Sequence, residues 1–424
     1  MTFFYHILSL PVAFLLIPLF TALSLFSKNK FKLLHHHFGF TPKIKKDDGK
    51  ALWFYALSLG EVKAALPVLS IIREKNPDLK IAVSVTTDSG YEGAMEHLKM
   101  ADQIFFHPLD CLPFTRLALR RINPDIYVVT DTGFWPGLID QLHQKNIPKI
   151  LLNGRISQAS ARGYLKAGSL FKTMFQQFDR LCMQNESSRK AIAEMGVNPQ
   201  SIEVTGDTKF DALKPVTEEK KDYWRKVFNL EQSTPVWVAG STHAGEEEII
   251  LTAHEQLKAS FPDLVLILAP RRIERIKELS HLLEYKKIPF FLRSKLENSP
   301  PESVILLDTL GELAEIYSLG QLAFVGRSLL PPGGGHSLLE PLSNGVAVMH
   351  GPHVENIRPV AEEAHINGLS FTVNNSNEIR RKAQEILEQK ELAGDFAAKA
   401  KSFISNKKGP SEKMAEIVLK TVQK

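Results

Sequence analysis

Apolar and polar positions alternate along residues 51–424 in the rhythm of an α/β protein. Short apolar runs alternate with longer amphipathic stretches, which predicts parallel strands joined by helices. In the first half we expect strands at Leu52–Ala56, Ile81–Thr86, Gln103–Phe106, Ile126–Val129, Lys149–Leu152, Leu181–Gln184 and Ile202–Thr205. In the second half we expect them at Val236–Ala239, Leu264–Leu268, Phe290–Leu292, Val304–Leu307, Leu322–Val325 and Val346–Met349.

The repeated rhythm predicts two Rossmann-like domains in one chain. We place the N-terminal domain at residues 28–212, a polar linker at 213–234, the C-terminal domain at 235–405 and a last helix at 406–424. Open parallel sheets bind ligands beyond the carboxyl ends of their strands. We therefore expect two domains facing a central cleft, with the functional residues at strand ends.

The first 27 residues contain no charged side chain. From Ile7 to Phe26, 15 of 20 residues are apolar, which is about the length that crosses the ~30 Å hydrocarbon layer as a helix. Lysines follow this run instead of preceding it, which is not the order of a secretory signal. We predict a membrane anchor at residues 1–27. Pro11 and Pro18 would kink a spanning helix, so a segment that only dips into the inner leaflet and a buried core helix stay open as alternatives.

The formal net charge of +5 is confined to one segment. Residues 28–50 hold seven lysines and two aspartates, and removing them from the totals of 52 basic and 47 acidic residues leaves 45 of each. A local basic excess beside an apolar run favours a membrane surface over nucleic acid. Lysines behind the run keep the body on the cytoplasmic side. The two cysteines, Cys111 and Cys182, form no CxxC pair, so neither a disulfide framework nor a structural zinc site is expected.

Strand ends in the first half carry residues suited to acid–base chemistry. Glu61 falls on the first turn of a helix, where a carboxylate can act as a general base or can simply complement the helix dipole. The residues alone leave both interpretations open. Asp131 and Trp135 follow the fourth strand and are expected to face the cleft. Lys209 follows the seventh strand, where it could neutralise a phosphate.

The second half has the pattern of an anion and nucleotide site. Residues 240–247 follow a strand and open a helix, so their backbone N–H groups could hold phosphate oxygens. Glycines at 333–335 allow close approach of a ligand, and Glu340 could bind the two hydroxyls of a ribose. A glycine run can equally be a flexible loop.

Several nucleotide motifs are missing from the sequence. No GxxxxGK[ST] occurs, and no GxGxxG follows the first strand, which disfavours P-loop and ordinary dinucleotide-binding proteins. No Asp-x-Asp occurs either, which argues against a carboxylate pair that holds a divalent metal on a nucleotide diphosphate. We therefore expect a metal-independent transfer, in which lysine and helix N-termini supply the positive field.

Eight short segments occur in a characteristic order along the chain: Ser58–Glu61, Trp135–Pro136, Asn153–Ser157, Gly206–Asp211, Ser241–Glu247, Pro270–Arg271, Asp308–Leu313 and Gly334–Glu340. Taken in this order, they resemble the bacterial transferases of 3-deoxy-D-manno-octulosonic acid (Kdo), which move Kdo from CMP-Kdo to a lipid A precursor. The resemblance covers essentially the whole chain, including the apolar N-terminus.

The resemblance implies a GT-B fold and an inverting transfer at the cytoplasmic face of the cell inner membrane. Glu61 is implied as the general base, and Asp131 and Lys209 as groups that help to stabilise the transition state. The implied contacts to CMP are Pro270, Arg271, Gly311, Glu312, Leu313, Ser337, Leu338, Leu339 and Glu340. The implied partners are CMP-Kdo as donor substrate, a lipid A precursor and the membrane surface, with no resident cofactor, metal or nucleic acid.

The chain also departs from the family pattern. Family members usually read Glu-Thr-Glu-Leu-Trp-Pro-Asn at residues 131–137, so one carboxylate is shorter here and another is replaced by Gly133. Ser337 and Leu338 stand where Asn and Pro are usual, and Arg327 replaces a customary glycine. Two alternatives therefore stay open. One is a related GT-B transferase or epimerase that uses a UDP-sugar, and the other is a catalytically inactive membrane-surface binding protein.

Overall fold

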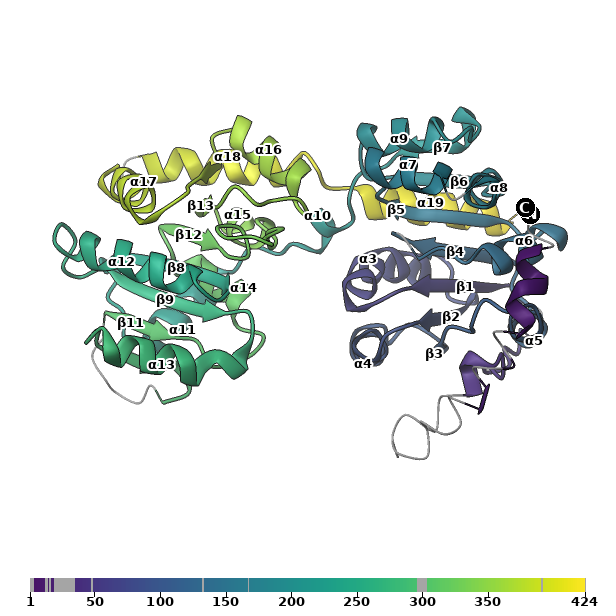
Figure 1. Ribbon diagram of the computed structural model, residues 1–424, viewed down its shortest axis with the longest axis horizontal. Helices are drawn as coiled ribbons and strands as arrows, with labels where there is room; N and C mark the ends of the chain where they lie inside the picture. Colours follow the sequence, from purple (N-terminus) through teal and green to yellow (C-terminus); the bar gives the residue numbers. More distant parts are fainter. Residues whose placement is uncertain are drawn as a thin grey trace. The chain divides into compact units, whose positions relative to one another are not determined.

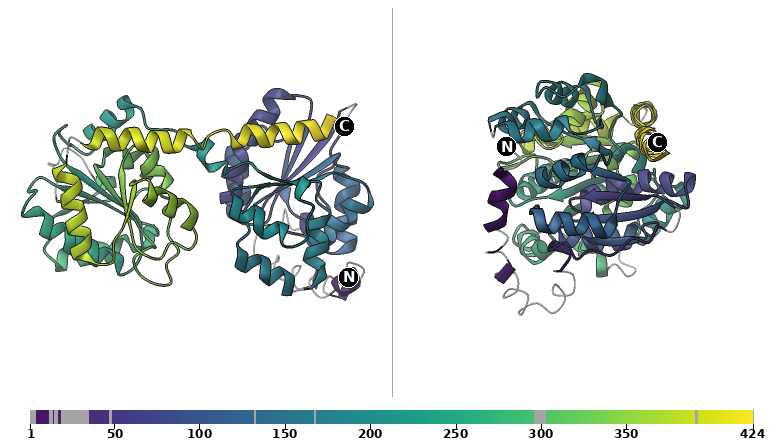
Figure 2. Two further views of the ribbon diagram at one scale, coloured as in Figure 1. Left: turned by 90° about the horizontal axis from the view of Figure 1, so that it is seen from above. Right: turned by 90° about the vertical axis from the view of Figure 1, so that its right-hand side faces the viewer.

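The computed structural model describes residues 4–11, 14, 17–18, 35–46, 49–131, 133–166, 168–295, 303–389 and 392–423. The chain forms two compact units. Unit 1 comprises residues 1–212 and 407–424, and unit 2 comprises residues 213–406. In each unit a parallel sheet carries helices on both faces (Figure 1, Figure 2).

The sheet of unit 1 has seven parallel strands in the order β3-β2-β1-β4-β5-β6-β7. Every residue of β1 is buried, so its continuous apolar run reflects a strand covered on both faces. The order reverses between β1 and β4, where open α/β sheets place their ligands. The strands are β1 Ala51–Ala56, β2 Lys80–Val85, β3 Gln103–Phe106, β4 Ile126–Thr130, β5 Lys149–Gly154, β6 Arg180–Met183 and β7 Ile202–Val204.

Two apolar cores flank this sheet. One lies under α3 and α19, where Val62 packs with Met414 and Val418, so the last helix of the chain completes unit 1. The other core contains Trp53 and Tyr55 and lies under α5, α6 and α8. The helices are α3 Leu59–Lys75, α4 Asp88–His97, α5 Leu112–Ile122, α6 Pro136–Gln144, α7 Gln158–Lys166, α8 Ser169–Gln176, α9 Glu186–Ala193, η1 Pro199–Ser201, α10 Lys209–Ala212 and α19 Pro410–Gln423.

The sheet of unit 2 also has seven parallel strands, in the order β10-β11-β9-β8-β12-β13-β14. The strands are β8 Val236–Thr242, β9 Val265–Pro270, β10 Phe290–Leu292, β11 Val304–Leu306, β12 Leu322–Val325, β13 Ala347–His350 and β14 Ser370–Thr372. Its helices are α11 Glu218–Val227, α12 Glu246–Lys258, η2 Ile273–Arg275, α13 Ile276–Tyr285, η3 Arg293–Lys295, α14 Leu313–Ile316, η4 Tyr317–Leu319, α15 Leu339–Ser343, α16 Arg358–Ile366, α17 Ser376–Glu388 and α18 Leu392–Ser405.

The predicted linker at residues 213–234 is part of the body of unit 2. It contains α11, whose Trp224 and Phe228 are buried. The indole Nε1 of Trp224 donates to Glu315 Oε2 at 2.7 Å and so ties α11 to α14. The prediction of a separate linker was therefore wrong, because the charged residues of this segment coat the outside of a packed helix.

The predicted membrane anchor at residues 1–27 is described only in part. No helix within the described ranges is long and apolar enough to cross a membrane, so the spanning helix gains no support from them. Residues 4–11 are helical, with His6 and Ser9 buried, whereas the side chains of Phe4 and Leu8 are each 69% exposed. Lys28, Lys30 and Lys32 of the basic segment lie outside the described residues.

Candidate active site

Asp131 stands at the carboxyl end of β4, next to the point where the strand order of unit 1 reverses. Its backbone is in the left-handed region, with φ of 63°, and its N–H donates to Leu152 O of β5 at 3.0 Å. The residue is only 6% exposed. This placement holds a carboxylate against the sheet edge instead of in solvent.

The pKa of the Asp131 carboxyl is raised to about 6, chiefly because burial disfavours its charged form. The Arg155 guanidinium, whose Nε lies 3.9 Å from Asp131 Oδ1, opposes this rise. Glu61 raises the pKa further and Lys209 lowers it. The structure thus brings Glu61, Asp131 and Lys209, which follow three different strands, into one electrostatic cluster.

Glu61 lies on the first turn of α3 and is half-buried. Its Oε2 accepts a hydrogen bond from the backbone N–H of Ser58 at 2.9 Å and another from the Ser58 hydroxyl. This is the helix-capping role that sequence reasoning left open. Oε1 takes no part in these two hydrogen bonds, so capping the helix and accepting a proton are compatible roles for this carboxylate.

Lys209 begins the short helix α10 and is exposed. The loop before it is fixed from within unit 1, because the N–H of Thr208 donates to Asn153 Oδ1 at 3.1 Å. Asp211 fixes the other side by accepting the N–H groups of Gly409 and Ser411, each at 2.7 Å. These contacts position the backbone of Lys209 and leave its side chain outside the core.

An aromatic group lies beside this cluster, in which sequence reasoning found the half-buried Trp135 and missed the buried Tyr55 and His107. The Tyr55 ring is 4.2 Å from the His107 ring, and His107 stacks on Trp135 at 5.2 Å. The Tyr55 hydroxyl lies 2.9 Å from Thr86 Oγ1, and burial raises the pKa of Tyr55 to about 12. A Cβ at position 133 would overlap the Tyr55 ring, so any larger residue there would displace the ring.

Glu246 organises the strand ends of unit 2. This carboxylate, 1% exposed, lies on the first turn of α12 and accepts hydrogen bonds from four backbone N–H groups. The donors are His243 and Arg327 at 2.8 Å, and Ser328 and Leu329 at 2.9 Å. Glu246 therefore joins the loop after β8 to the loop after β12. Sequence reasoning offered only a weak signal for this role, namely three adjacent glutamates at a helix start.

Two histidines meet where these loops join. His243 Nε2 lies 3.1 Å from His336 Nε2, and their rings stack. The pKa of His336 is lowered to about 4, chiefly by burial and also by the nearby charges of Arg271 and Arg327. The pair is therefore uncharged at neutral pH, and the arginines supply the positive charge of this edge.

The residues predicted to contact CMP lie at or after the carboxyl ends of unit 2 strands. Pro270 ends β9, and the N–H of Arg271 donates to Thr242 O of β8 at 3.0 Å. Gly311 adopts a φ of 86° in the turn that follows β11 and precedes α14. Glu312 is already engaged, since its Oε1 accepts from Arg293 Nη2 at 3.1 Å. Leu313 packs under β8, where a Cβ on Gly240 would lie 3.1 Å from Leu313 Cδ1.

The last four candidates differ in what they can offer to a ligand. Ser337 is exposed and Glu340 is half-buried, so their side chains are accessible. Leu338 and Leu339 are buried in the core of unit 2. These two leucines can therefore contact a nucleotide only through backbone atoms.

Comparison with known proteins identifies the family. A family model described as "3-Deoxy-D-manno-octulosonic-acid transferase (kdotransferase)" matches residues 32–212. A 3-deoxy-D-manno-octulosonic acid transferase of Haemophilus influenzae is 31% identical over 98% of this chain and 97% of its own length. The chain belongs to the Kdo transferase family. A second family relative, from Chlamydophila psittaci, is 29% identical over 89% of this chain and 86% of its own.

The fold of this Kdo transferase also occurs in enzymes that act on UDP-sugars. The UDP-GlcNAc 2-epimerase of Neisseria meningitidis aligns with a TM-score of 0.59 at 16% identity, over 88% of this chain and 99% of the epimerase. This likeness concerns the fold alone. Together with the two parallel sheets, it supports a GT-B-like architecture.

The structure shows how Arg327, one of the departures from the family pattern, is accommodated in its loop. Arg327 stands where a glycine is customary and adopts a φ of 59°, the left-handed region that glycine tolerates best. Its N–H still donates to Glu246, so the loop keeps its anchor despite the side chain. The guanidinium is thereby held beside His243 and His336, whose pKa values it lowers.

Proposed function

We propose that this Kdo transferase family member moves Kdo from CMP-Kdo to a lipid A precursor with inversion at the sugar carbon. The observation that carries the proposal is the cluster of Glu61, Asp131 and Lys209 at the strand edge of unit 1. It pairs a solvent-accessible carboxylate with a buried one and with a lysine, a combination suited to deprotonating a hydroxyl and stabilising developing charge.

In the proposed reaction Glu61 acts as the general base. Its carboxylate takes the proton of an acceptor hydroxyl as the hydroxyl oxygen attacks the anomeric carbon of Kdo. The bond between that carbon and the phosphate oxygen of CMP breaks, and CMP leaves with the electron pair. Atoms and charges balance without an oxidant, a reductant or a metal.

Asp131 and Lys209 are proposed to stabilise opposite charges in the transition state. With a pKa of about 6, the Asp131 carboxylate is mostly ionised at neutral pH and can stabilise positive charge on the sugar. Lys209 is exposed at the start of α10 and can neutralise negative charge on the departing phosphate. This use of lysine in place of a metal fits the absence of an Asp-x-Asp sequence.

Unit 2 is proposed to hold the CMP part of the donor. Arg271 and Arg327 supply positive charge for the phosphate, and the half-buried Glu340 is the candidate for the ribose hydroxyls. Leu338 and Leu339 would contribute backbone groups only. The remaining proposed contacts are Pro270, Gly311, Glu312, Leu313 and Ser337.

We place the protein at the cytoplasmic face of the inner membrane. Support comes from the helical segment 4–11, which buries polar side chains and exposes Phe4 and Leu8. This is the reverse of a soluble surface helix and suits contact with acyl chains. The lysines of residues 28–50 would add attraction to anionic headgroups, apart from Lys46, whose Nζ is paired with Asp125 Oδ2 at 2.7 Å. In a flotation gradient with anionic vesicles the protein should rise with the lipid. Protein that stays in the dense bottom fraction would reject this placement.

The enzymatic proposal is tested by measuring CMP release. Purified protein is incubated with CMP-Kdo and tetra-acylated lipid A precursor in EDTA, together with the variants Glu61→Gln and Glu74→Gln. The second variant is a matched control, because Glu74 is exposed on the same helix. We expect wild type and control to release CMP, and Glu61→Gln to bind CMP without turnover. No release by wild type, or strict dependence on a divalent metal, would reject the proposal.

A UDP-sugar is the second candidate donor, because the fold is shared with a UDP-GlcNAc 2-epimerase. Competition binding separates the two possibilities. If UDP displaces bound CMP at lower concentration than CMP displaces UDP, the enzyme uses a UDP-sugar. CMP binding without any turnover by wild type would instead favour a catalytically inactive binding protein.

A further inference from the structure

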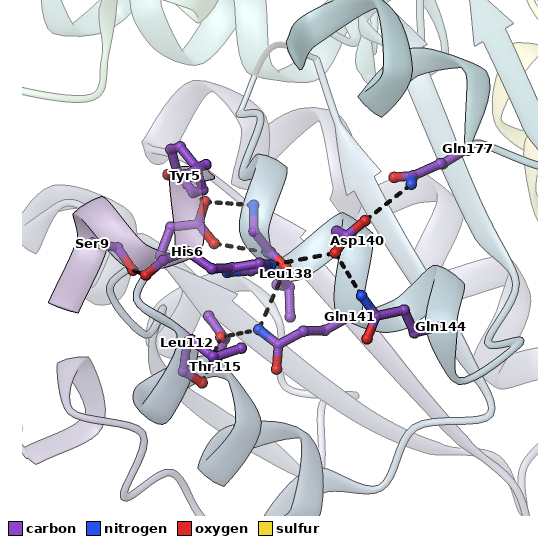
Figure 3. A network of polar contacts seen from close by, with 12 residues as sticks. Tyr5, His6, Ser9, Leu112, Thr115, Leu138, Asp140, Gln141, Gln144 and Gln177 are labelled. Carbon is purple, nitrogen blue, oxygen red and sulfur yellow. Dashed lines mark hydrogen bonds and ion pairs between the residues drawn. The ribbon is translucent and has the colours of Figure 1, made fainter. Parts of the chain in front are cut away.

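The helical segment 4–11 contacts the rest of unit 1 through polar groups (Figure 3). The Tyr5 hydroxyl donates to Asp110 Oδ2 at 2.7 Å. His6 Nε2 lies 3.3 Å from Asp140 Oδ2, on α6. The carbonyl of Ser9 accepts a hydrogen bond from Cys111 Sγ at 3.4 Å. The segment is thus seated by specific polar contacts.

Asp110 links this segment to the start of α6. Besides the Tyr5 hydroxyl, its carboxylate accepts the backbone N–H groups of Gly137 and Leu138, each at 2.8 Å. These amides belong to the first helical turn, whose N–H groups have no partner within a helix. Asp110 is 8% exposed, and burial raises its pKa while the three hydrogen bonds oppose the rise. The Tyr5 hydroxyl is therefore one of three donors that hold a costly buried carboxylate in place.

The helix that Asp110 caps directly follows the loop with the candidate catalytic carboxylate. α6 begins at Pro136, and Asp131 and Trp135 lie in the residues just before it. Further along the same helix, Asp140 accepts from Gln144 Nε2 of α6 at 2.8 Å and from Gln177 Nε2 at 3.3 Å, and the second bond ties α6 to the end of α8 (Figure 3). A shift of the first turn of α6 would therefore move the Asp131 loop relative to Glu61.

The contact between Tyr5 and Asp110 leaves no space for a side chain at Gly137. A Cβ there would lie 2.8 Å from Asp110 Oδ1 and 3.1 Å from Tyr5 Cε1. Any larger side chain would displace the carboxylate, the tyrosine ring or both. Glycine at this position thus leaves room for both Asp110 and Tyr5.

We propose that Tyr5 and Asp110 are positioning residues, through which the seating of the N-terminal segment sets Asp131 and Trp135, which precede α6, for the acceptor. The inference rests on the proposed function, since it assigns these two residues to the acceptor side of the reaction. It predicts that loosening the segment impairs use of the acceptor and leaves the donor site in unit 2 unaffected.

The test compares Tyr5→Phe, which removes only the hydroxyl, with Tyr285→Phe, a matched change at a tyrosine that is 86% exposed. For Tyr5→Phe we expect kcat/KM for the lipid acceptor to fall about tenfold, the size of a lost hydrogen bond to a charged group. CMP affinity should stay at the wild-type value, and Tyr285→Phe should match wild type in both. Unchanged acceptor kinetics, or an equal loss toward donor and acceptor, would overturn the proposal.

A double variant tests the shared site. Gly137→Ala should lower acceptor kcat/KM like Tyr5→Phe, and combining the two should cost little more than either alone, because both disturb the same contact. If the loss of acceptor kcat/KM in the double variant equals the product of the two single losses, the proposal is overturned.

Amide hydrogen exchange at Gly137 and Leu138 separates this inference from the proposed function, because it needs no turnover. Faster exchange in Tyr5→Phe supports the coupling even if wild type transfers no Kdo. Unchanged exchange overturns the coupling even if wild type is active.

Discussion

Replacing Asp131 by asparagine is expected to stabilise the folded protein at neutral pH and to lower its transfer activity. The side chain is buried at the end of β4, and its Oδ1 has no hydrogen-bond partner within the described residues. Asparagine has the same shape, carries no charge and tolerates the left-handed backbone that this position adopts. The substitution therefore removes the electrostatic cost of the site together with its proposed chemistry.

The size and sign of the effect follow from the pKa. Burial raises the pKa of Asp131 from 3.8 to about 6, and this shift corresponds to about 3 kcal/mol at 1.36 kcal/mol per pKa unit. Between pH 4 and 6 the folded state holds the proton more tightly than the unfolded chain does. The free energy of unfolding of wild type therefore falls as pH rises through this window and levels off above it. Asparagine does not titrate, so the advantage of the variant should grow by about 2 kcal/mol from pH 4.5 to pH 7.5, because part of the full difference is already present at pH 4.5.

Urea unfolding followed by circular dichroism at pH 4.5 and pH 7.5 measures this difference. Asp78→Asn is the control, because Asp78 is exposed in the same unit and its substitution should change neither stability nor activity. CMP release by Asp131→Asn should fall at least tenfold, a modest loss for a group that stabilises the transition state. A stability difference that does not vary with pH, or full activity of the variant, would refute this view of Asp131.

Three further substitutions probe the scaffold of the two sites. Glu246→Gln places an amide NH₂ against backbone donors, which should lower the free energy of unfolding by about 3 kcal/mol and weaken CMP binding. Glu248→Gln, at an exposed position of the same helix, is the control and should match wild type in thermal unfolding and in calorimetry of CMP binding. Gly133→Ala forces a Cβ into the Tyr55 ring and should lower stability by about 1–3 kcal/mol in urea titration; an unchanged midpoint would mean that the ring moves freely. Arg327→Gly should add about 1 kcal/mol by relieving the left-handed backbone and yet weaken CMP binding in calorimetry. Unaltered affinity would remove the proposed phosphate contact.

The strands could be predicted from the sequence because both faces of each sheet are covered. A fully buried parallel strand such as β1 is a continuous apolar run, which stands out from the amphipathic helices around it. β14, Ser370–Thr372, was missed because Phe371 is its only apolar residue, whereas the equally short β10 and β11 are apolar throughout. The linker prediction failed at α11 because the acidic and basic residues dominate its composition, whereas Trp224 and Phe228 fix its packing.

The candidate catalytic residues could be proposed from the sequence because they follow strands directly, and parallel strands bring their carboxyl ends to one edge. The groups that hold these catalytic residues in place could not be proposed from the sequence. Asp110 meets Gly137 from 27 residues away, and Glu246 reaches Arg327 across 81 residues. Such contacts depend on the order of strands in the sheet, which the apolar pattern does not encode.

Mass spectrometry of the lipid product tests the central assignment most directly. Tetra-acylated lipid A precursor is incubated with CMP-Kdo and wild type, Glu61→Gln or Glu74→Gln. With wild type and Glu74→Gln the acceptor should gain the mass of one or more Kdo residues, and with Glu61→Gln it should stay unmodified. An unmodified acceptor with wild type, or a product formed only from a UDP-sugar, would contradict the assignment as a CMP-Kdo-dependent transferase.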